Sequence, residues 1–156
     1  RYVDNALLRI PVLGTLQEKL ILTELTRTLG LLIGAGTPIL EALNITSQTT
    51  GNIWYRDSLL VVSKKVEKGV PVAAALSADP HFPLILTQMV RVGESTGKID
   101  ESLLKVSTYF ESEAAQMVAT LTTLLEPLII VVLGIGVAFL IISIITPIYN
   151  LTSAIQ

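Results

Sequence analysis

Residues 127–145 constrain this chain more than any other stretch, because none of these nineteen residues carries an ionisable side chain. At a helical rise of about 1.5 Å per residue, such a helix spans about 30 Å, the hydrocarbon thickness of a bilayer. Only Gly134, Gly136 and Ser143 interrupt the large apolar residues, and small residues suit a membrane helix. We therefore interpret the stretch as a transmembrane helix. The alternative is a buried core helix, which so small a domain would have to surround on every side.

The charged residues divide the chain in the same way. All eleven Lys and Arg and all thirteen Asp and Glu lie at or before Glu126. We therefore predict a leading segment over 1–14, a helical bundle domain over 15–123, a transmembrane helix over 124–148 and a short tail over 149–156. The net charge of −2 and the lack of a basic, aromatic-rich face argue against nucleic acid as a partner. The absence of cysteine excludes a disulfide framework and cysteine-ligated metal sites.

Helical spacing of apolar residues before residue 127 predicts an all-α fold. Pro11 and Gly14 are expected to break any helix before Thr15. Thr15 and Glu18 form a capping box for a first helix over 16–34. Further helices are expected after the turns near residues 38, 52, 71, 83 and 98.

Asn52 is expected to cap the third of these helices. In that helix we expect four apolar residues to face the core: Leu59, Leu60, Val62 and Val66.

Two of the predicted turns repeat one pattern, G-x-P-x-x-x-A-L, as GTPILEAL from Gly36 and GVPVAAAL from Gly69. Gly36 and Gly69 suit a left-handed helix end, and Pro38 and Pro71 suit the first position of the next helix. Thr37 is a candidate cap for the helix that follows Gly36. A helical repeat array would also give such an echo, but it needs about three copies. We interpret the pattern as repeated corner geometry.

The segment GESTGK, from Gly93, lies between a fifth helix predicted over 84–92 and a sixth that begins near Ile99. Gly93 and Gly97 are predicted to shape this corner because glycine adopts positive φ at little cost. Glu94 is predicted to make a structural or partner contact there. A phosphate-binding loop is excluded, because only three residues separate the glycines and Ile99 replaces the hydroxyl that ligates magnesium.

From Ile99 onward the helical period continues without Gly or Pro until Pro127, so one helix is predicted to rise from the bundle into the membrane. Pro127 is expected to bend this helix and Pro147 to end it. Glu126 and Pro127 form the membrane junction, either as a joint or only as a boundary marker. The predicted packing seam consists of Ile99, Leu103, Val106, Phe110, Ala114, Met117, Leu121 and Leu124.

Gly134 and Ala138 place two small residues four apart in the membrane segment, which allows close approach of another helix. That helix belongs either to a second copy in a homodimer or to other membrane helices of the same protein.

The sequence shows no catalytic, cofactor-binding or metal-binding constellation. His81 lies in a proline-rich loop without a second histidine or a cysteine to share a metal. The carboxylate pairs Asp100 with Glu101 and Glu111 with Glu113 suit the first turn and a solvated face of a helix. We therefore predict a protein that is not an enzyme.

The chain also resembles a known family through four segments in order: RTLGLLIGAGTPILEAL, KVEKGVPVAAAL, FPLILTQMVRVGESTGKIDESL and LLEPLIIVVLGIGVAFLIISIITPIY. They are similar to the type II secretion F-domain family, the inner-membrane platform proteins called GspF in type II secretion and PilC in type IV pili. The resemblance covers residues 7–149. Its most specific marks are G-E-x-x-G at Gly93 and the pair Glu126 and Pro127.

The resemblance implies a six-helix antiparallel bundle on the cytoplasmic side of the bacterial inner membrane, the second of two such bundles in a longer protein. It implies a non-enzymatic platform without a cofactor. The implied partners are a cytoplasmic hexameric ATPase, pilin or pseudopilin subunits and other inner-membrane components of the machine. Two rival functions stay open: the anchor half of an enzyme or receptor, favoured by metal or nucleotide dependence, and a peptide-binding helical-repeat scaffold, favoured by further copies of the corner pattern.

Overall fold

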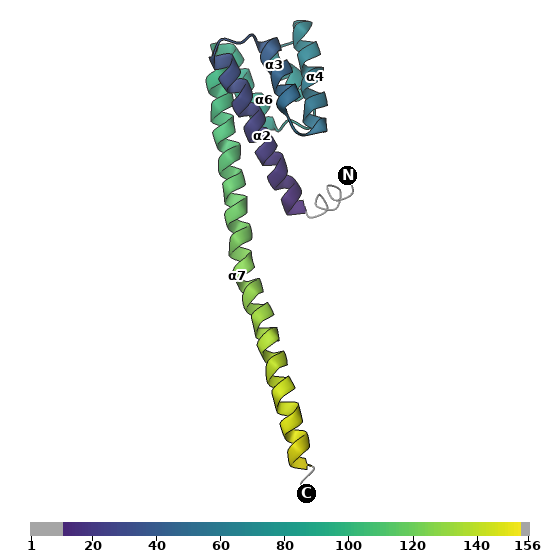
Figure 1. The fold of residues 1–156 in the computed structure, drawn as a ribbon. Coiled ribbons are helices and arrows are strands. Elements are labelled where there is room, and N and C mark those ends of the chain that lie inside the picture. The colour runs from purple at the N-terminus through teal and green to yellow at the C-terminus, as the bar shows by residue number, and fades with distance from the viewer. Residues whose placement is uncertain (1–10, 154–156) are drawn as a thin grey trace. The chain divides into compact units, whose positions relative to one another are not determined.

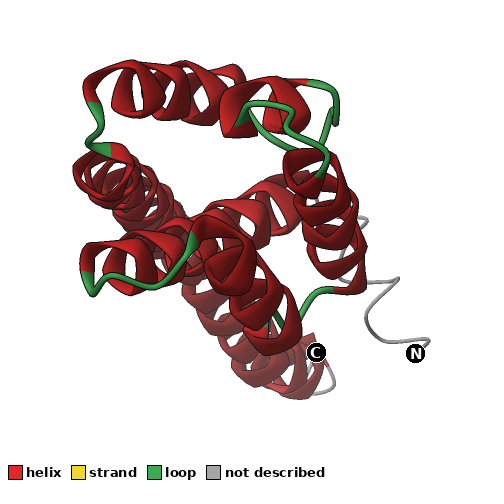
Figure 2. Cartoon of the chain, turned by 90° about the horizontal axis from the view of Figure 1, so that it is seen from above, coloured by secondary structure: helices red, strands yellow, loops and turns green. Residues whose placement is uncertain are grey.

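A computed structural model describes residues 11–153, which form helices joined by short loops (Figures 1 and 2). The predicted all-α fold, six helices with the last one continuing into the apolar stretch, is confirmed. The chain divides into two compact units, the bundle (Arg1–Ala115) and the C-terminal unit (Gln116–Gln156). The boundary predicted at residue 123 stays a prediction. In chain order the helices are α2 (Pro11–Gly34), α3 (Ile39–Thr49), α4 (Ile53–Glu67), α5 (Val72–Ser77), α6 (Leu84–Thr96) and α7 (Ile99–Ser153).

Within the bundle, successive helices alternate in direction, so their connections fall at two ends (Figure 1). The α2–α3, α4–α5 and α6–α7 corners share one end, which we call the glycine end. Gly34, in the last turn of α2, lies there beside the Asp100 side chain in the first turn of α7. The α3–α4 and α5–α6 loops share the opposite end, where the Tyr55 hydroxyl donates a hydrogen bond of 3.2 Å to the His81 carbonyl.

The core of the bundle draws apolar side chains from every helix, as the helical spacing predicted. Leu60 is an exception, since it was expected to face inward and is 39% exposed. Adjacent helical residues point about 100° apart, so Leu59 and Leu60 cannot both reach the same core. Leu59 is the one that is buried. The largest fully buried apolar side chains are Phe110, Leu22, Leu43, Leu59, Leu86, Val62, Val90 and Val106.

Inside the bundle, α7 is fastened to α2 by polar contacts as well as by packing. The buried Ser107 hydroxyl donates a hydrogen bond of 3.1 Å to the Thr23 carbonyl across the two helices. The Lys19 ammonium lies 2.7 Å from Glu113 Oε2, a buried oxygen without another partner among the described residues. The same ammonium lies 5.2 Å from the centre of the Phe110 ring. These contacts fix the register of α7 against α2.

Two helix boundaries differ from the prediction because proline did not act as expected. The helix α2 includes Pro11, so Thr15 and Glu18 lie inside it and do not form a capping box. Proline lacks an N–H, but the first turn of a helix needs none. Likewise α7 continues through Pro127 and past Pro147 to Ser153, although we expected it to end at Pro147. One lost hydrogen bond does not end a helix whose other turns are intact.

The C-terminal unit contains a stretch, residues 129–145, that is apolar around the whole helix apart from Ser143. Every side chain that the structure describes between residues 129 and 145 is exposed. The most apolar window of α7 has a mean hydropathy of 3.2, and none of it is buried. Such a surface is not stable in water. By length and composition, α7 is able to cross a membrane, and it is the one helix among the described residues that meets this test.

The burial contrast along α7 gives a matched pair of substitutions. Phe110→Ala should lower the free energy of unfolding by about 3–5 kcal/mol, because Phe110 is fully buried in the bundle. Phe139→Ala should change it little, because Phe139 is 71% exposed in the C-terminal unit. Urea denaturation of the detergent-solubilised chain, followed by circular dichroism, measures both. Equal losses in the two variants would contradict this description of the core.

Candidate functional site

Three glycines form the corners at the glycine end. Gly36, Gly69 and Gly97 have φ values of +90°, +88° and +71°, in the left-handed region that favours glycine. After each glycine, the next residue's N–H reaches back five residues to close the helix end. These bonds run from Thr37 to the Leu32 carbonyl (3.0 Å), from Val70 to Lys65 (3.1 Å) and from Lys98 to Gly93 (2.8 Å). The two corners of the sequence echo and the GESTG corner therefore share one geometry.

Pro38 and Pro71 occupy equivalent positions just before α3 and α5. Their φ and ψ angles are −55° and 142° for Pro38 and −56° and 144° for Pro71. Each is the N-cap residue, one position earlier than predicted, and each carbonyl accepts the first helical hydrogen bond, from Ala42 and Ala75 respectively. Thr37 is therefore not the cap of α3. Neither proline has a side-chain oxygen, so the first N–H groups of these helices need another acceptor.

Glu94 supplies that acceptor for α5. Its two carboxylate oxygens accept hydrogen bonds from the backbone N–H groups of Val72 (2.5 Å) and Ala73 (2.9 Å). Glu94 stands in the last turn of α6, so a side chain of one helix caps another helix. A carboxylate at a helix N-terminus is also stabilised by the helix dipole. Glu94 thereby joins the α4–α5 corner, at Gly69 and Pro71, to the α6–α7 corner.

Gly93 has a different role from the predicted one, which was to shape the corner. It lies inside α6, which continues to Thr96, and does not form the turn. A Cβ atom at this position would lie 2.8 Å from the Ile99 Cα atom and 2.8 Å from the Ser102 hydroxyl oxygen. Such distances are too short for non-bonded atoms. Gly93 therefore allows the end of α6 to lie directly against the start of α7, and only Gly97 makes the turn.

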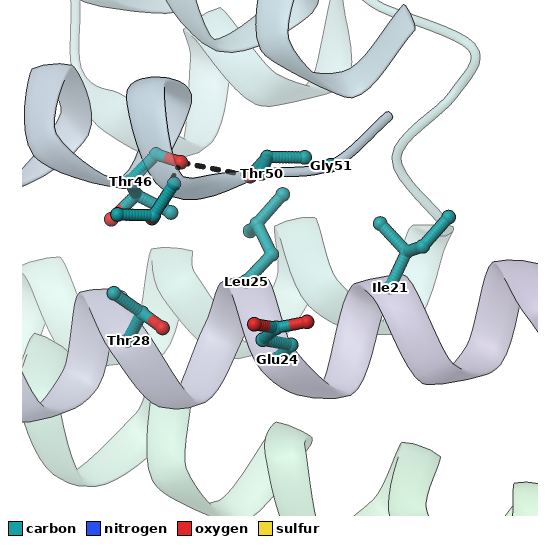
Figure 3. A pocket seen from close by; sticks show the side chains of 8 residues that line it. Ile21, Glu24, Leu25, Thr28, Thr46, Thr50 and Gly51 are labelled. Carbon is teal, nitrogen blue, oxygen red and sulfur yellow. Dashed lines mark hydrogen bonds between the residues drawn. The ribbon is translucent and has the colours of Figure 1, made fainter. Parts of the chain in front are cut away.

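A small hollow lies between α2 and the end of α3. Two of its hydroxyl groups are already committed, because Thr50 Oγ1 donates to the Thr46 carbonyl (2.8 Å) and Thr46 Oγ1 donates to the Ala42 carbonyl (2.8 Å). Figure 3 shows the hollow lined by Ile21, Glu24, Leu25 and Thr28 of α2 and by Thr46, Thr50 and Gly51.

The predicted membrane residues all lie in α7. Glu126 and Pro127 are exposed and the helix passes through them without a break. Gly134 and Ala138 are exposed too, and nothing lies within 4 Å of a Cβ atom placed at Gly134. Their roles as a membrane junction and as a helix-packing face stay predictions.

The described residues contain no group of three or more His, Cys, Asp or Glu side chains placed to hold a metal ion. His81 Nδ1 lies 2.7 Å from Asp79 Oδ1 in the α5–α6 loop. Burial opposes ionisation of Asp79, but hydrogen bonds from the Ser58 hydroxyl and from His81 outweigh burial and lower the Asp79 pKa. The pair holds the loop in place.

These features define a helical bundle protein whose last helix is apolar and whose helices are joined by glycine corners. The sequence model of one family, described as "Type II secretion system (T2SS), protein F", matches residues 25–147. The chain belongs to this family. Together with the apolar helix, this membership indicates that the protein associates with a membrane.

Curated relatives come from both kinds of machine. The chain is 36% identical over its whole length to the "Type IV pilus assembly protein PilC" of Myxococcus xanthus, covering 37% of that protein. It is 35% identical to the protein of the same name from Thermus thermophilus, covering 100% of this chain and 39% of that one. It is 37% identical to the "Type II secretion system protein F" of Xanthomonas campestris, covering 98% of this chain and 38% of that one. The chain thus spans less than half the length of these relatives.

Removal of the Glu94 carboxylate tests the cross-helix cap. Glu94→Ala should lower the free energy of unfolding by about 1–2 kcal/mol, because the Val72 and Ala73 N–H groups lose their acceptor. Glu41→Ala is the matched control, since Glu41 is an exposed carboxylate in the first turn of α3. Chemical denaturation compares the two variants. A Glu94 variant as stable as the Glu41 control would rule out the cap.

The two glycines of the G-E-x-x-G segment should respond differently to substitution. Gly97→Val should destabilise the bundle by about 1 kcal/mol or more, because valine resists positive φ. Gly93→Ala should also destabilise it, through contact with the backbone of Ile99. Gly51→Ala is the control, because Gly51 has an ordinary φ and open space around it. Thermal unfolding measures all three, and an unchanged melting temperature in Gly97→Val would contradict the left-handed corner.

Proposed function

We propose that this protein is a non-enzymatic platform of a type IV pilus or type II secretion machine. In this proposal it couples a cytoplasmic hexameric ATPase to the assembly of pilin or pseudopilin subunits. It lies in the bacterial inner membrane, with the bundle on the cytoplasmic side. Support comes from the family and from relatives that are named for type IV pilus assembly and for type II secretion.

The observation that carries the proposal is the continuity of α7. Its first part is buried in the bundle, where Leu103, Val106 and Phe110 belong to the core. The same helix continues without interruption through the apolar residues 129–145. A movement of the bundle is therefore transmitted along a helical backbone rather than lost in a flexible loop. Packing of pilin-like subunits or of a second copy against the apolar helix, at Gly134 and Ala138, belongs to the same proposal.

The test interrupts α7 between the two units. A flexible seven-residue Gly-Ser insert after Thr120 should abolish pilus assembly or secretion, while membrane insertion and ATPase recruitment stay normal. A seven-residue helical insert at the same place is the control. It lengthens the helix by two turns but changes the helical phase by only about 20°, so assembly should be retained at least in part.

The insertion site is chosen so that the bundle stays intact. Thr120 lies five residues after Ala115, the last residue of the bundle. Neither insert therefore breaks the pairing of Lys19 with Glu113. Normal assembly with the flexible insert would overturn the rigid coupling helix. Loss of ATPase recruitment with either insert would instead show that the bundle had been damaged.

A further inference from the structure

The end of the bundle opposite the glycine end carries an open pocket that the corners and the core do not explain. The start of α2, the start of α4 and the α5–α6 loop converge there. We call it the Trp54 pocket, and its lining residues are Glu18, Asn52, Trp54, Tyr55, Pro80 and His81.

Two aromatic rings of the pocket are held in fixed positions. The Trp54 side chain is 70% exposed, yet its ring stacks on the His81 ring with centres 6.2 Å apart and an angle of 19° between planes. Asp79 Oδ1 accepts a hydrogen bond from the His81 backbone N–H (2.9 Å), and it lies 2.7 Å from Nδ1 of the His81 ring. The buried Tyr55 ring packs edge-on against the His81 ring, with centres 6.3 Å apart. A large indole is thus presented to the outside on a rigid support.

Two carboxylates lie in or near the pocket: Glu18 lines it, and Asp79 contacts His81, which also lines it. Burial, together with the nearby carboxylates of Glu18 and Asp79, raises the pKa of the Tyr55 hydroxyl, which stays neutral. Hydrogen bonds keep the pKa of Asp79 below its usual value despite burial, so this carboxylate is ionised. Among the described residues, no cation pairs with Glu18. A carboxylate and an exposed indole ring therefore line the same pocket.

The same pocket is unsuited to an anion. The N-terminal N–H groups of Trp54 and Tyr55 are already accepted by the Asn52 side chain, at 2.9 and 3.3 Å. Arg56, the cation in the first turn of α4, is turned to Asp57, with 3.4 Å between Nε and Oδ1. Neither backbone donors nor a free cation are offered to a negatively charged group.

We propose that the Trp54 pocket receives an arginine side chain of a partner protein. A guanidinium group stacks on an indole face and pairs with a carboxylate, and it is more weakly hydrated than an ammonium group. Exposed tryptophan is also typical of the residues that dominate protein–protein binding energy. The inference rests on the proposed function only in that the partner is another protein of the machine.

Trp54 is the single tryptophan of the chain, so its fluorescence reports on the pocket directly. The full chain in detergent is titrated with the peptide acetyl-Gly-Arg-Gly-amide, and with the same peptide carrying citrulline, the neutral isostere of arginine. The arginine peptide should change the Trp54 emission with saturation, and the citrulline peptide should not. An equal response to both peptides, or no saturable response to the arginine peptide, would overturn the proposal.

Two variants on α2 test whether Glu18 is the carboxylate that pairs with the arginine. Glu18→Gln should weaken binding of the arginine peptide about fivefold, the size of one exposed ion pair. Glu24→Gln should leave it unchanged, because Glu24 is an exposed carboxylate of the same helix outside the pocket. Equal weakening in both variants would mean nonspecific attraction and would overturn the site. A lysine peptide that binds more tightly than the arginine peptide would overturn the choice of arginine.

The coupling proposal and the pocket proposal can be overturned independently of each other. Peptide binding to the bundle does not depend on whether α7 transmits force, so a failed titration leaves the coupling proposal standing. Conversely, assembly that survives the flexible insert leaves the pocket in place. In the assembled machine, Glu18→Lys should reduce assembly while membrane insertion stays normal, and normal assembly in that variant would overturn a role for the pocket there.

Discussion

The bundle depends on the carboxylate of Glu94, which belongs to α6 and caps the N-terminus of α5. The helix α5 has only six residues, too few to be stable alone, and it begins after a proline that has no side-chain oxygen. Glu94 of α6 accepts the first N–H groups of α5, which fixes the α4–α5 corner to the end of α6. That position requires the neighbouring Gly93, which lets α7 start against α6, and Gly97, which turns the chain. The α4–α5 and α6–α7 corners therefore both depend on one short segment.

The last helix passes between two environments while its backbone pattern stays the same. In the bundle, α7 buries one stripe, which includes Phe110 and Ala114, and fastens it to α2 with Ser107. Between residues 129 and 145 its apolar side chains are exposed. The hydrophobic effect stabilises the first part by packing and requires a lipid environment for the second. One continuous helix thus belongs to a protein core and to an apolar segment that is able to cross a membrane.

The two ends of the bundle use their polar groups in different ways. At the glycine end, the Glu94 carboxylate and the helix-terminal carbonyls are hydrogen-bonded within the chain, so that end is suited to rigidity. At the opposite end, internal hydrogen bonds hold Asp79 and Asn52, while Glu18 and Trp54 are left facing outward. An exposed aromatic ring on a rigid support is suited to recognition.

The sequence by itself determined the features that depend on neighbours along the chain. These are the helical period, the left-handed glycines Gly36, Gly69 and Gly97, the Asn52 cap, and the apolar length of residues 127–145. Only the tertiary structure decided that Glu94 caps a helix more than twenty residues away, that Gly93 serves close packing, and that Leu60 faces outward. Periodicity shows that a stripe exists, but which side of it is buried depends on the helices packed against it. Proline is likewise a local signal: Pro11 stands in the first turn of α2, where no N–H is needed, and at Pro147 the hydrogen bonds of the surrounding turns outweighed the lost one.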